Sequence, residues 1–169
     1  MGRTVEHGKV PAARGELVKV TVPLENPAWH GYGAELLWAE LSTPGIYRLR
    51  NSPFYAHGLS AYDMVAAEYQ DEKLAFRAVR ERGGHSTYRL HVPAGIDTPA
   101  FQLAWRPLQT IGCTYEQADR LLAVDVPPAT DIYEAYELFE AGVKAGVWDF
   151  DEGHCGHPLR ATRGSKTDE

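Results

Sequence analysis

Alternation of apolar and polar side chains is the dominant pattern between residues 16 and 92. Leu17–Leu24 and Ile46–Asn51 alternate along their length, which is typical of strands with one buried face. Four further short, turn-bounded runs also predict strands: Ala34–Leu41, Asp63–Gln70, Leu74–Arg82 and Ser86–Pro93. Helix propensity leaves a helix open for Ala34–Leu41, but its short length and the Pro44-Gly45 turn favour a strand. Such short strands predict a small, curved antiparallel sheet or barrel over residues 16–92.

The pattern changes to helical periodicity after Pro93. The Asp97-Thr98-Pro99 segment is typical of a helix start, which predicts a helix over Ala100–Ile111 that Pro107 kinks or ends. The short apolar run Leu121–Val126 predicts a buried strand.

The strongest helical pattern in the chain covers Asp131–Gly146. Asp131 and Glu134 form a capping-box-like start, and Gly146 suits a left-handed stop. Four apolar residues recur at helical spacing, and we expect them to form the buried face of this helix: Ile132, Tyr136, Phe139 and Val143. Val147–Phe150 follows as a last predicted strand.

Together these elements predict an α+β protein in two parts. The second part, residues 86–157, starts with the strand Ser86–Pro93 and alternates strand, helix, strand, helix, strand, as in a ferredoxin-like βαβαβ layer. Residues 1–15 and 160–169 are rich in glycine, arginine and other polar residues, and we expect both segments to be disordered.

Composition narrows the classes of function. The 169 residues include 44% apolar residues, enough for a sizeable core, and carry a formal net charge of −6. Nucleic-acid binding and docking on anionic lipid both need a positive surface, so we expect neither, whereas a basic protein partner is favoured. No run approaches the roughly 20 apolar residues of a membrane span. The absence of a signal-peptide pattern, with Cys113 and Cys155 outside any paired spacing, favours a cytoplasmic protein.

The stretch Asp149–His157 concentrates residues that can bind a metal. Three of them could supply nitrogen and sulfur ligands to one zinc ion: His154, Cys155 and His157. No second Cys/His pair exists in the sequence, so a fourth ligand would have to come from elsewhere: His85, Asp151 or Cys113. The alternative is a polar strand exit, and we predict no bound metal and no other cofactor.

Two loops carry more polar and aromatic residues than plain connections require. The Gly83-Gly84 pair allows close backbone approach, and the aromatic residues of the loop Asn51–Asp63 either wall a pocket or pack beneath the loop. We predict a binding surface where the two loops meet, formed by seven residues: Asn51, Phe54, Tyr55, Asp63, His85, Ser86 and Thr87. The competing interpretation is structural, with Asp63 capping its loop while His85 and Thr87 satisfy buried backbone groups. No catalytic residue is predicted, because the sequence lacks a phosphate loop, a nucleophile elbow and a paired-histidine helix.

Six segments resemble the DUF4265 family of bacterial proteins, which has no established activity: ELLWAE, YRLRNSPFYAHGLSAYDMV, GGHSTYRL, LQTIGCTYE, LLAVDVP and GVWDFDEG. The resemblance covers about Val18 to Glu152, and its most specific pieces are Asn51–Phe54 with Gly58-Leu59-Ser60 and Asp63, and Gly84–Thr87. It implies that several polar residues belong to the family pattern: Asn51, Asp63, His85, Ser86 and Thr87. The half from Gly112 to Glu152 also resembles the ferredoxin-like inhibitor of ribonuclease E, through its apolar strand, its helix and its Gly-x-Trp-x-x-acidic ending.

Three hypotheses for function follow. The first is a non-catalytic protein-binding or regulatory module, from the acidic charge, the missing catalytic motifs and the likeness to the inhibitor. The second is a small-molecule-binding or hydrolase-like enzyme with a pocket around Asp63 and His85, and hydrogen bonding between these two residues in a pocket would favour it. A flat apolar patch would favour the first. The third is a toxin immunity protein, since such proteins are often small, acidic and cytosolic.

Overall fold

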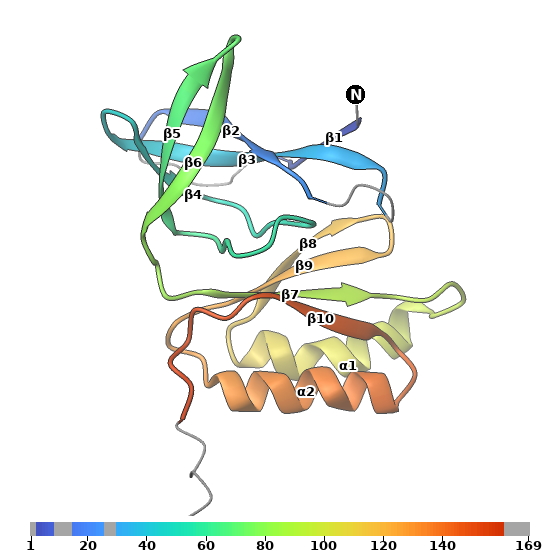
Figure 1. Cartoon of the computed structure of the whole chain (residues 1–169). Helices are drawn as coiled ribbons and strands as arrows, with labels where there is room; N and C mark the ends of the chain where they lie inside the picture. The colour runs from blue at the N-terminus through green and yellow to red at the C-terminus, as the bar shows by residue number, and fades with distance from the viewer. Residues whose placement is uncertain (1–2, 9–14, 26–29, 161–169) are drawn as a thin grey trace, which may run out of the picture.

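The computed structural model describes residues 3–8, 15–25 and 30–160. Within them, a β-barrel lies against one face of a second sheet, and two helices cover the other face of that sheet (Figure 1). The barrel part contains β1 (Arg3–Glu6), β2 (Leu17–Pro23), β3 (Tyr32–Thr43), β4 (Ile46–Leu49), β5 (Met64–Gln70) and β6 (Lys73–Glu81). The helix-covered part contains β7 (Ser86–His91), α1 (Thr98–Thr110), β8 (Thr114–Ala118), β9 (Leu121–Val126), α2 (Ile132–Lys144) and β10 (Asp149–His154).

Five strands close the barrel in the order β3-β2-β6-β5-β4, because β3 also pairs with β4. Alternate strand positions supply its buried interior, which includes Val20, Leu37, Leu49, Val65 and Leu74. The predicted barrel is therefore confirmed. One pairing is not antiparallel: β2 and β6 run parallel and pair only at Val20–Leu74 and Thr21–Ala75.

The ferredoxin-like layer is also confirmed, with one strand more than the pattern predicts. Its antiparallel sheet has the order β10-β7-β9-β8, and the elements follow one another as βαββαβ. The additional strand β8 has the sequence TYEQA and lies at the edge of the sheet. Because no residue of this outer strand is fully buried, its sequence lacks the apolar run by which the other strands are predicted.

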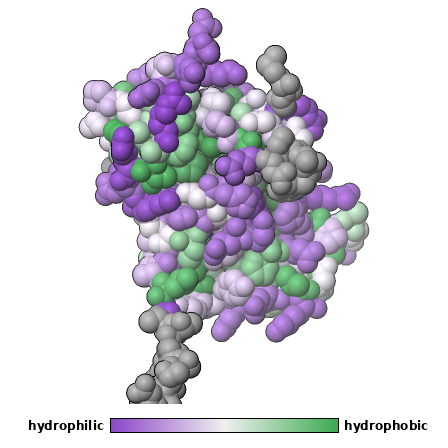
Figure 2. All heavy atoms as spheres, viewed as in Figure 1, coloured by the Kyte–Doolittle hydropathy of each residue, from purple (hydrophilic) through white to green (hydrophobic). Residues whose placement is uncertain are grey.

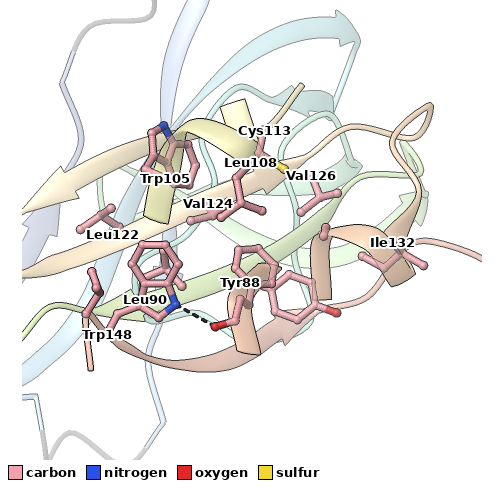
Figure 3. Close-up of a cluster of buried hydrophobic side chains, with 13 residues drawn as sticks. Tyr88, Leu90, Trp105, Leu108, Cys113, Leu122, Val124, Val126, Ile132 and Trp148 are labelled. Atoms are coloured by element: carbon pink, nitrogen blue, oxygen red, sulfur yellow. Dashed lines mark hydrogen bonds between the residues drawn. The ribbon is translucent and has the colours of Figure 1, made fainter. Parts of the chain in front are cut away.

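Aromatic and aliphatic side chains fill the space between this sheet and its helices (Figure 3). The indole Nε1 of Trp148 donates a hydrogen bond to the carbonyl of Phe139 at 2.9 Å, so the buried tryptophan also satisfies its polar atom. A Cβ at Gly142 would lie 2.1 Å from the Trp148 ring, and only glycine lets the α2 backbone approach the indole this closely. The segment that leads into β10 therefore packs directly against the backbone of α2.

The predicted helix over residues 131–146 is confirmed, but half of its predicted buried face is wrong. Asp131 caps the helix by accepting from the amides of residues 133 and 134, and Gly146 has a φ of +74°. The buried residues of α2 are Ile132, Ala135, Phe139 and Gly142. Tyr136 and Val143 are 43% and 39% exposed. These two side chains lie on the flank of α2 beside β10, the edge strand of this sheet, and no further strand of the described residues covers them.

The predicted helix around residues 100–111 is also present, and Pro107 does not end it. α1 continues to Thr110 beyond this proline. Pro107 is exposed, so the hydrogen bond that its missing N–H cannot make falls on the solvent side of the helix. Neither helix of the described residues has the length and apolar character that crossing a membrane requires.

The expectation of disorder over residues 1–15 is wrong for Arg3–Glu6, which forms β1. Its backbone pairs in parallel with β3, and Val5 is buried in a small cluster with Phe54, Leu121 and Ala123. Backbone pairing with an otherwise open strand edge, together with one buried apolar side chain, orders a segment whose composition is typical of disorder. Residues 1–2, 9–14 and 161–169 lie outside the described residues.

Candidate functional site

The two loops predicted to form a binding surface do meet. The Asp63 carboxylate accepts hydrogen bonds from the Gly83 amide at 2.9 Å and the Ser60 amide at 3.0 Å, and it pairs with Arg82. The Thr87 hydroxyl donates to Ser60 Oγ at 2.8 Å. A Cβ at Gly83 would lie 2.5 Å from the Tyr62 carbonyl oxygen, so the close backbone approach expected of this glycine pair is present.

His85 does not hydrogen-bond to Asp63, the contact that would have favoured the second hypothesis. Its Nδ1 lies 2.8 Å from the Asp125 carboxylate, and its ring lies against Tyr62 at a centroid distance of 4.6 Å. A small cavity of about 100 Å³ lies beside this pair and is lined by Arg50, Ser52, Tyr62, Thr114, Glu116 and Asp125. Asp125 was not among the predicted site residues. It is the one charged residue in the apolar run LLAVDV, and a charged residue in a buried strand usually has a specific partner.

A second polar cluster, of which the sequence prediction included only Asn51, joins the barrel to the helix-covered sheet. We call it the Glu35 cluster: Glu35, His7, Glu116 and Asn51. Glu35 is fully buried and accepts hydrogen bonds from three consecutive loop amides, those of residues 54, 55 and 56, at 2.6 to 3.0 Å. His7 bridges two carboxylates, with Nε2 at 2.7 Å from Glu35 and Nδ1 at 2.6 Å from Glu116. Asn51 donates to Glu116 and accepts from the Trp38 amide, both at 2.7 Å.

The charges in the Glu35 cluster reinforce one another. Burial alone would lower the pKa of His7, but hydrogen bonds and charge attraction from Glu116 and Glu35 outweigh burial and raise this pKa to about 9. Burial alone would raise the pKa of Glu35, but His7 and the loop amides hold it below its usual range. An imidazolium between two carboxylates is the resulting state at neutral pH. Position 35 shares one strand face with Leu37 and Ala39. The opposite face, with Leu36 and Trp38, is equally apolar in sequence, so the pattern alone did not indicate that Glu35 is buried.

Arg89 holds the same loop from the sheet side. It is 1% exposed and donates to the carbonyls of Phe54 and Tyr55, to His57 Nε2 and to Asp151. The backbone around Phe54 is therefore held through its amides by Glu35 and through its carbonyls by Arg89. Of the seven predicted residues, five are buried where the barrel meets the helix-covered sheet: Asn51, Phe54, Asp63, Ser86 and Thr87. Tyr55 and His85 are partly exposed. Ligand binding by these seven residues stays a prediction.

Two of the candidate metal ligands near the end of β10, Cys155 and His157, contact Ser86 within the chain. Ser86 Oγ lies 2.6 Å from His157 Nδ1 and accepts a hydrogen bond from the Gly156 amide at 2.9 Å. His157 Nε2 donates to the carbonyl of Pro127 at 2.8 Å, so both of its ring nitrogens are engaged. Cys155 Sγ lies 3.7 Å from Ser86 Oγ. Among the residues that the structure describes, no three His, Cys, Asp or Glu side chains are grouped to hold a metal ion.

A groove runs between α2 and β10 on the outer side of the helix-covered sheet. Its volume is about 620 Å³, and Tyr136, Val143 and Phe150 are apolar parts of its wall. The Tyr136 ring meets Phe150 edge to face at 5.3 Å. Within the described chain β10 pairs only with β7, so its outer edge is open beside this groove. In Figure 2, hydrophobic residues gather in patches over the layer that contains α2 and β10.

Comparison with known proteins supplies a family and a fold. The chain is similar to a hypothetical protein from Neisseria gonorrhoeae of known crystal structure, with a TM-score of 0.66 and 18% identity over 85% of this chain and 97% of the other. No curated protein matches the sequence. Residues 35–150, more than half of the chain, match the family described as a domain of unknown function, DUF4265. This span includes Glu35, the loop that Glu35 and Arg89 hold, the sheet, α2 and the start of β10, and the chain belongs to the DUF4265 family.

Proposed function

We propose that this protein is a protein-binding module that holds an extended, basic segment of a partner along β10 and α2. The observation that carries the proposal is the partial exposure of Tyr136 and Val143 beside an open strand edge. Exposed apolar side chains next to unpaired strand groups are the combination that strand-adding partners use, since the backbone provides hydrogen bonds and the side chains provide pockets.

The open part of β10 is short and well defined. The carbonyl of Gly153 already accepts a hydrogen bond from the Gly58 amide at 3.1 Å, so the barrel loop occupies that end of the strand. Phe150, Asp151 and Glu152 remain beside the groove. We therefore expect a partner segment of about four to six extended residues, a typical length for a short strand.

Charge around the groove indicates the chemistry of the partner. Glu140, Asp151 and Glu152 line it, against a single lysine, Lys144. Asp151 is partly neutralised by Arg89, at 2.8 Å, while no ion pair of Glu140 or Glu152 occurs among the described residues. Alternate side chains of an added strand point to opposite faces of the sheet, so apolar ones would contact Tyr136 and Val143 on the helix face while basic ones would lie near Asp151 on the other face.

Two synthetic peptides test the proposal. They share alternating valine and isoleucine, and the intervening positions are all lysine in one and all glutamate in the other. Fluorescence anisotropy should detect binding of the lysine peptide alone, weakening as salt is added. Tyr136→Ala should reduce that affinity at least tenfold, whereas Leu103→Ala, which removes a 78% exposed apolar side chain from α1, should leave it unchanged. Equal binding of both peptides, or equal effects of both substitutions, would reject the proposal.

A second candidate function is small-molecule binding or hydrolysis at the joint between the two loops. The pairing of His85 with Asp125 supports it, because a carboxylate that orients an imidazole is a recurring general-base arrangement. Turnover of p-nitrophenyl esters that is lost in both His85→Ala and Asp125→Asn, at unchanged melting temperature, would support this candidate. Absence of such turnover in the wild type leaves the protein-binding proposal standing and removes this candidate for esters.

A further inference from the structure

The barrel closes by only a short pairing along one seam, between β2 and β6. The two strands pair only at Val20–Leu74 and Thr21–Ala75. Beyond this point β2 stays on β3 and β6 stays on β5, and Pro23 has no amide to donate across the gap. The loop from Tyr55 to Leu59 covers one side of the opening.

The seam leads into a pocket of about 270 Å³. About half of its wall is apolar and includes Val22, Leu24, Phe76, Val79 and Leu59, and the other half is polar. An empty apolar cavity of about 150 Å³ is enough to bind benzene, so this pocket has room for a body of about ten non-hydrogen atoms. A well-packed barrel would have filled such a volume with its own side chains.

One polar side chain at this pocket has a defined hydrogen-bonding role. His57 lines the pocket, and its Nε2 lies 3.1 Å from Arg89 Nη2. Because a guanidinium can only donate, Nε2 must accept, and the ring proton of the neutral imidazole is on Nδ1. His57 therefore offers a hydrogen-bond donor to a ligand. Glu25 also lines the pocket and disfavours an anionic ligand.

We propose that this seam pocket binds a small, uncharged, apolar molecule carrying one hydroxyl or carbonyl group, which accepts a hydrogen bond from His57 Nδ1. The site lies in the barrel, apart from the α2–β10 groove, and it does not depend on the protein-binding function. Phe76 makes an aromatic body suitable, because the ligand ring can pack against it.

Benzyl alcohol and toluene are suitable probes because they differ in a single hydroxyl group. Titration followed by NMR should show saturable shifts of the methyl signals of Leu59 and Val79 with both probes. Val79→Trp, which fills the pocket, should weaken both at least tenfold, and Leu24→Trp, just after β2, fills it from the opposite side if the first variant is poorly folded. Leu41→Trp on β3, outside the pocket, is the matched control and should change neither affinity.

The role of His57 is tested separately. His57→Phe should weaken benzyl alcohol binding at least fivefold and leave toluene binding unchanged or tighter. Shifts that do not saturate, or that persist in both pocket-filling variants, would overturn the site. Equal loss of both probes in His57→Phe would overturn the assigned hydrogen bond.

Discussion

The buried carboxylate of Glu35 lies 2.7 Å from Nε2 of His7, and neither side chain is exposed. The contact joins the segment after β1 to the middle of the barrel, and Nδ1 of the same imidazole reaches Glu116 on β8. One histidine thus connects the beginning of the described chain to both sheets.

Replacing Glu35 should be among the most destabilising single changes. Glu35→Ala leaves three loop amides without an acceptor and His7 with one carboxylate, and we expect a loss of about 3–5 kcal/mol in the free energy of unfolding. Urea denaturation measures it. The matched control is Glu68→Ala, whose carboxylate forms an exposed pair with Arg77 and should contribute at most about 1 kcal/mol. Similar losses in both variants would contradict the assigned role of Glu35.

Stability should fall as the pH rises from 6.5 through 9. The folded state raises the pKa of His7 from 6.5 to about 9, so in this window the folded protein keeps a proton that the unfolded chain releases. The stabilisation from the protonated His7 is fully present below pH 6.5. Above pH 9 roughly 3 kcal/mol of the free energy of unfolding has been lost. Glu35 acts oppositely: its lowered pKa contributes stability above its unfolded value of 4.5, which is lost as the pH falls through the folded value. In His7→Gln the decline between pH 6.5 and 9 should disappear, and a decline unchanged from the wild type would refute its assignment to His7.

Phe139 and Tyr136 lie one helical turn apart on α2 and should differ sharply on truncation. Phe139 is fully buried against Tyr88 and Phe150, so Phe139→Ala should cost about 3–5 kcal/mol. Tyr136→Ala removes a half-exposed ring and should cost about 1 kcal/mol. Chemical denaturation of both variants provides the comparison, and a cost below about 1 kcal/mol for Phe139→Ala would be inconsistent with this core.

His85→Ala distinguishes a structural histidine from a functional one. Removing the imidazole leaves the partly buried Asp125 carboxylate without its partner, and we expect the melting temperature to fall by several degrees. Binding of the lysine peptide at the α2–β10 groove should be unchanged per folded molecule. An unaltered melting temperature would instead favour a role for His85 in binding a ligand.

The purified protein should contain no stoichiometric zinc. Both ring nitrogens of His157 are engaged within the chain, so the His154-Cys155-Gly156-His157 segment lacks one of its candidate ligands. Elemental analysis of the wild type and of His154→Ala measures the metal content. One zinc ion per chain in the wild type, absent from the variant, would show this expectation to be wrong.

Local patterns in the sequence were sufficient for most of the fold. Alternation predicted the strands around Val20 and Leu49, and capping chemistry predicted the ends of α2, because each depends on sterics and hydrogen bonds within a few residues. Periodicity also assigned Tyr136 and Val143 to the apolar side of α2. It could not indicate that the sheet ends at β10 and leaves that flank open.

The polar residues between the barrel and the helix-covered sheet could be predicted from the sequence only in part. The loops containing Asp63 and His85 could be predicted to meet, and the competing structural interpretation already had Asp63 capping its loop, as its bond from the Ser60 amide does. The partner of His85 could not be predicted, because it is Asp125, 40 positions later. The sequence determined that, in a strand, Glu35 shares one face with Leu37 and Ala39. Only the tertiary structure decided that His7, 28 positions earlier, and a loop 19 to 21 positions later would enclose it. The physical reason is that side-chain direction is set locally by the backbone, whereas the partner of a buried charge is set by how distant segments pack.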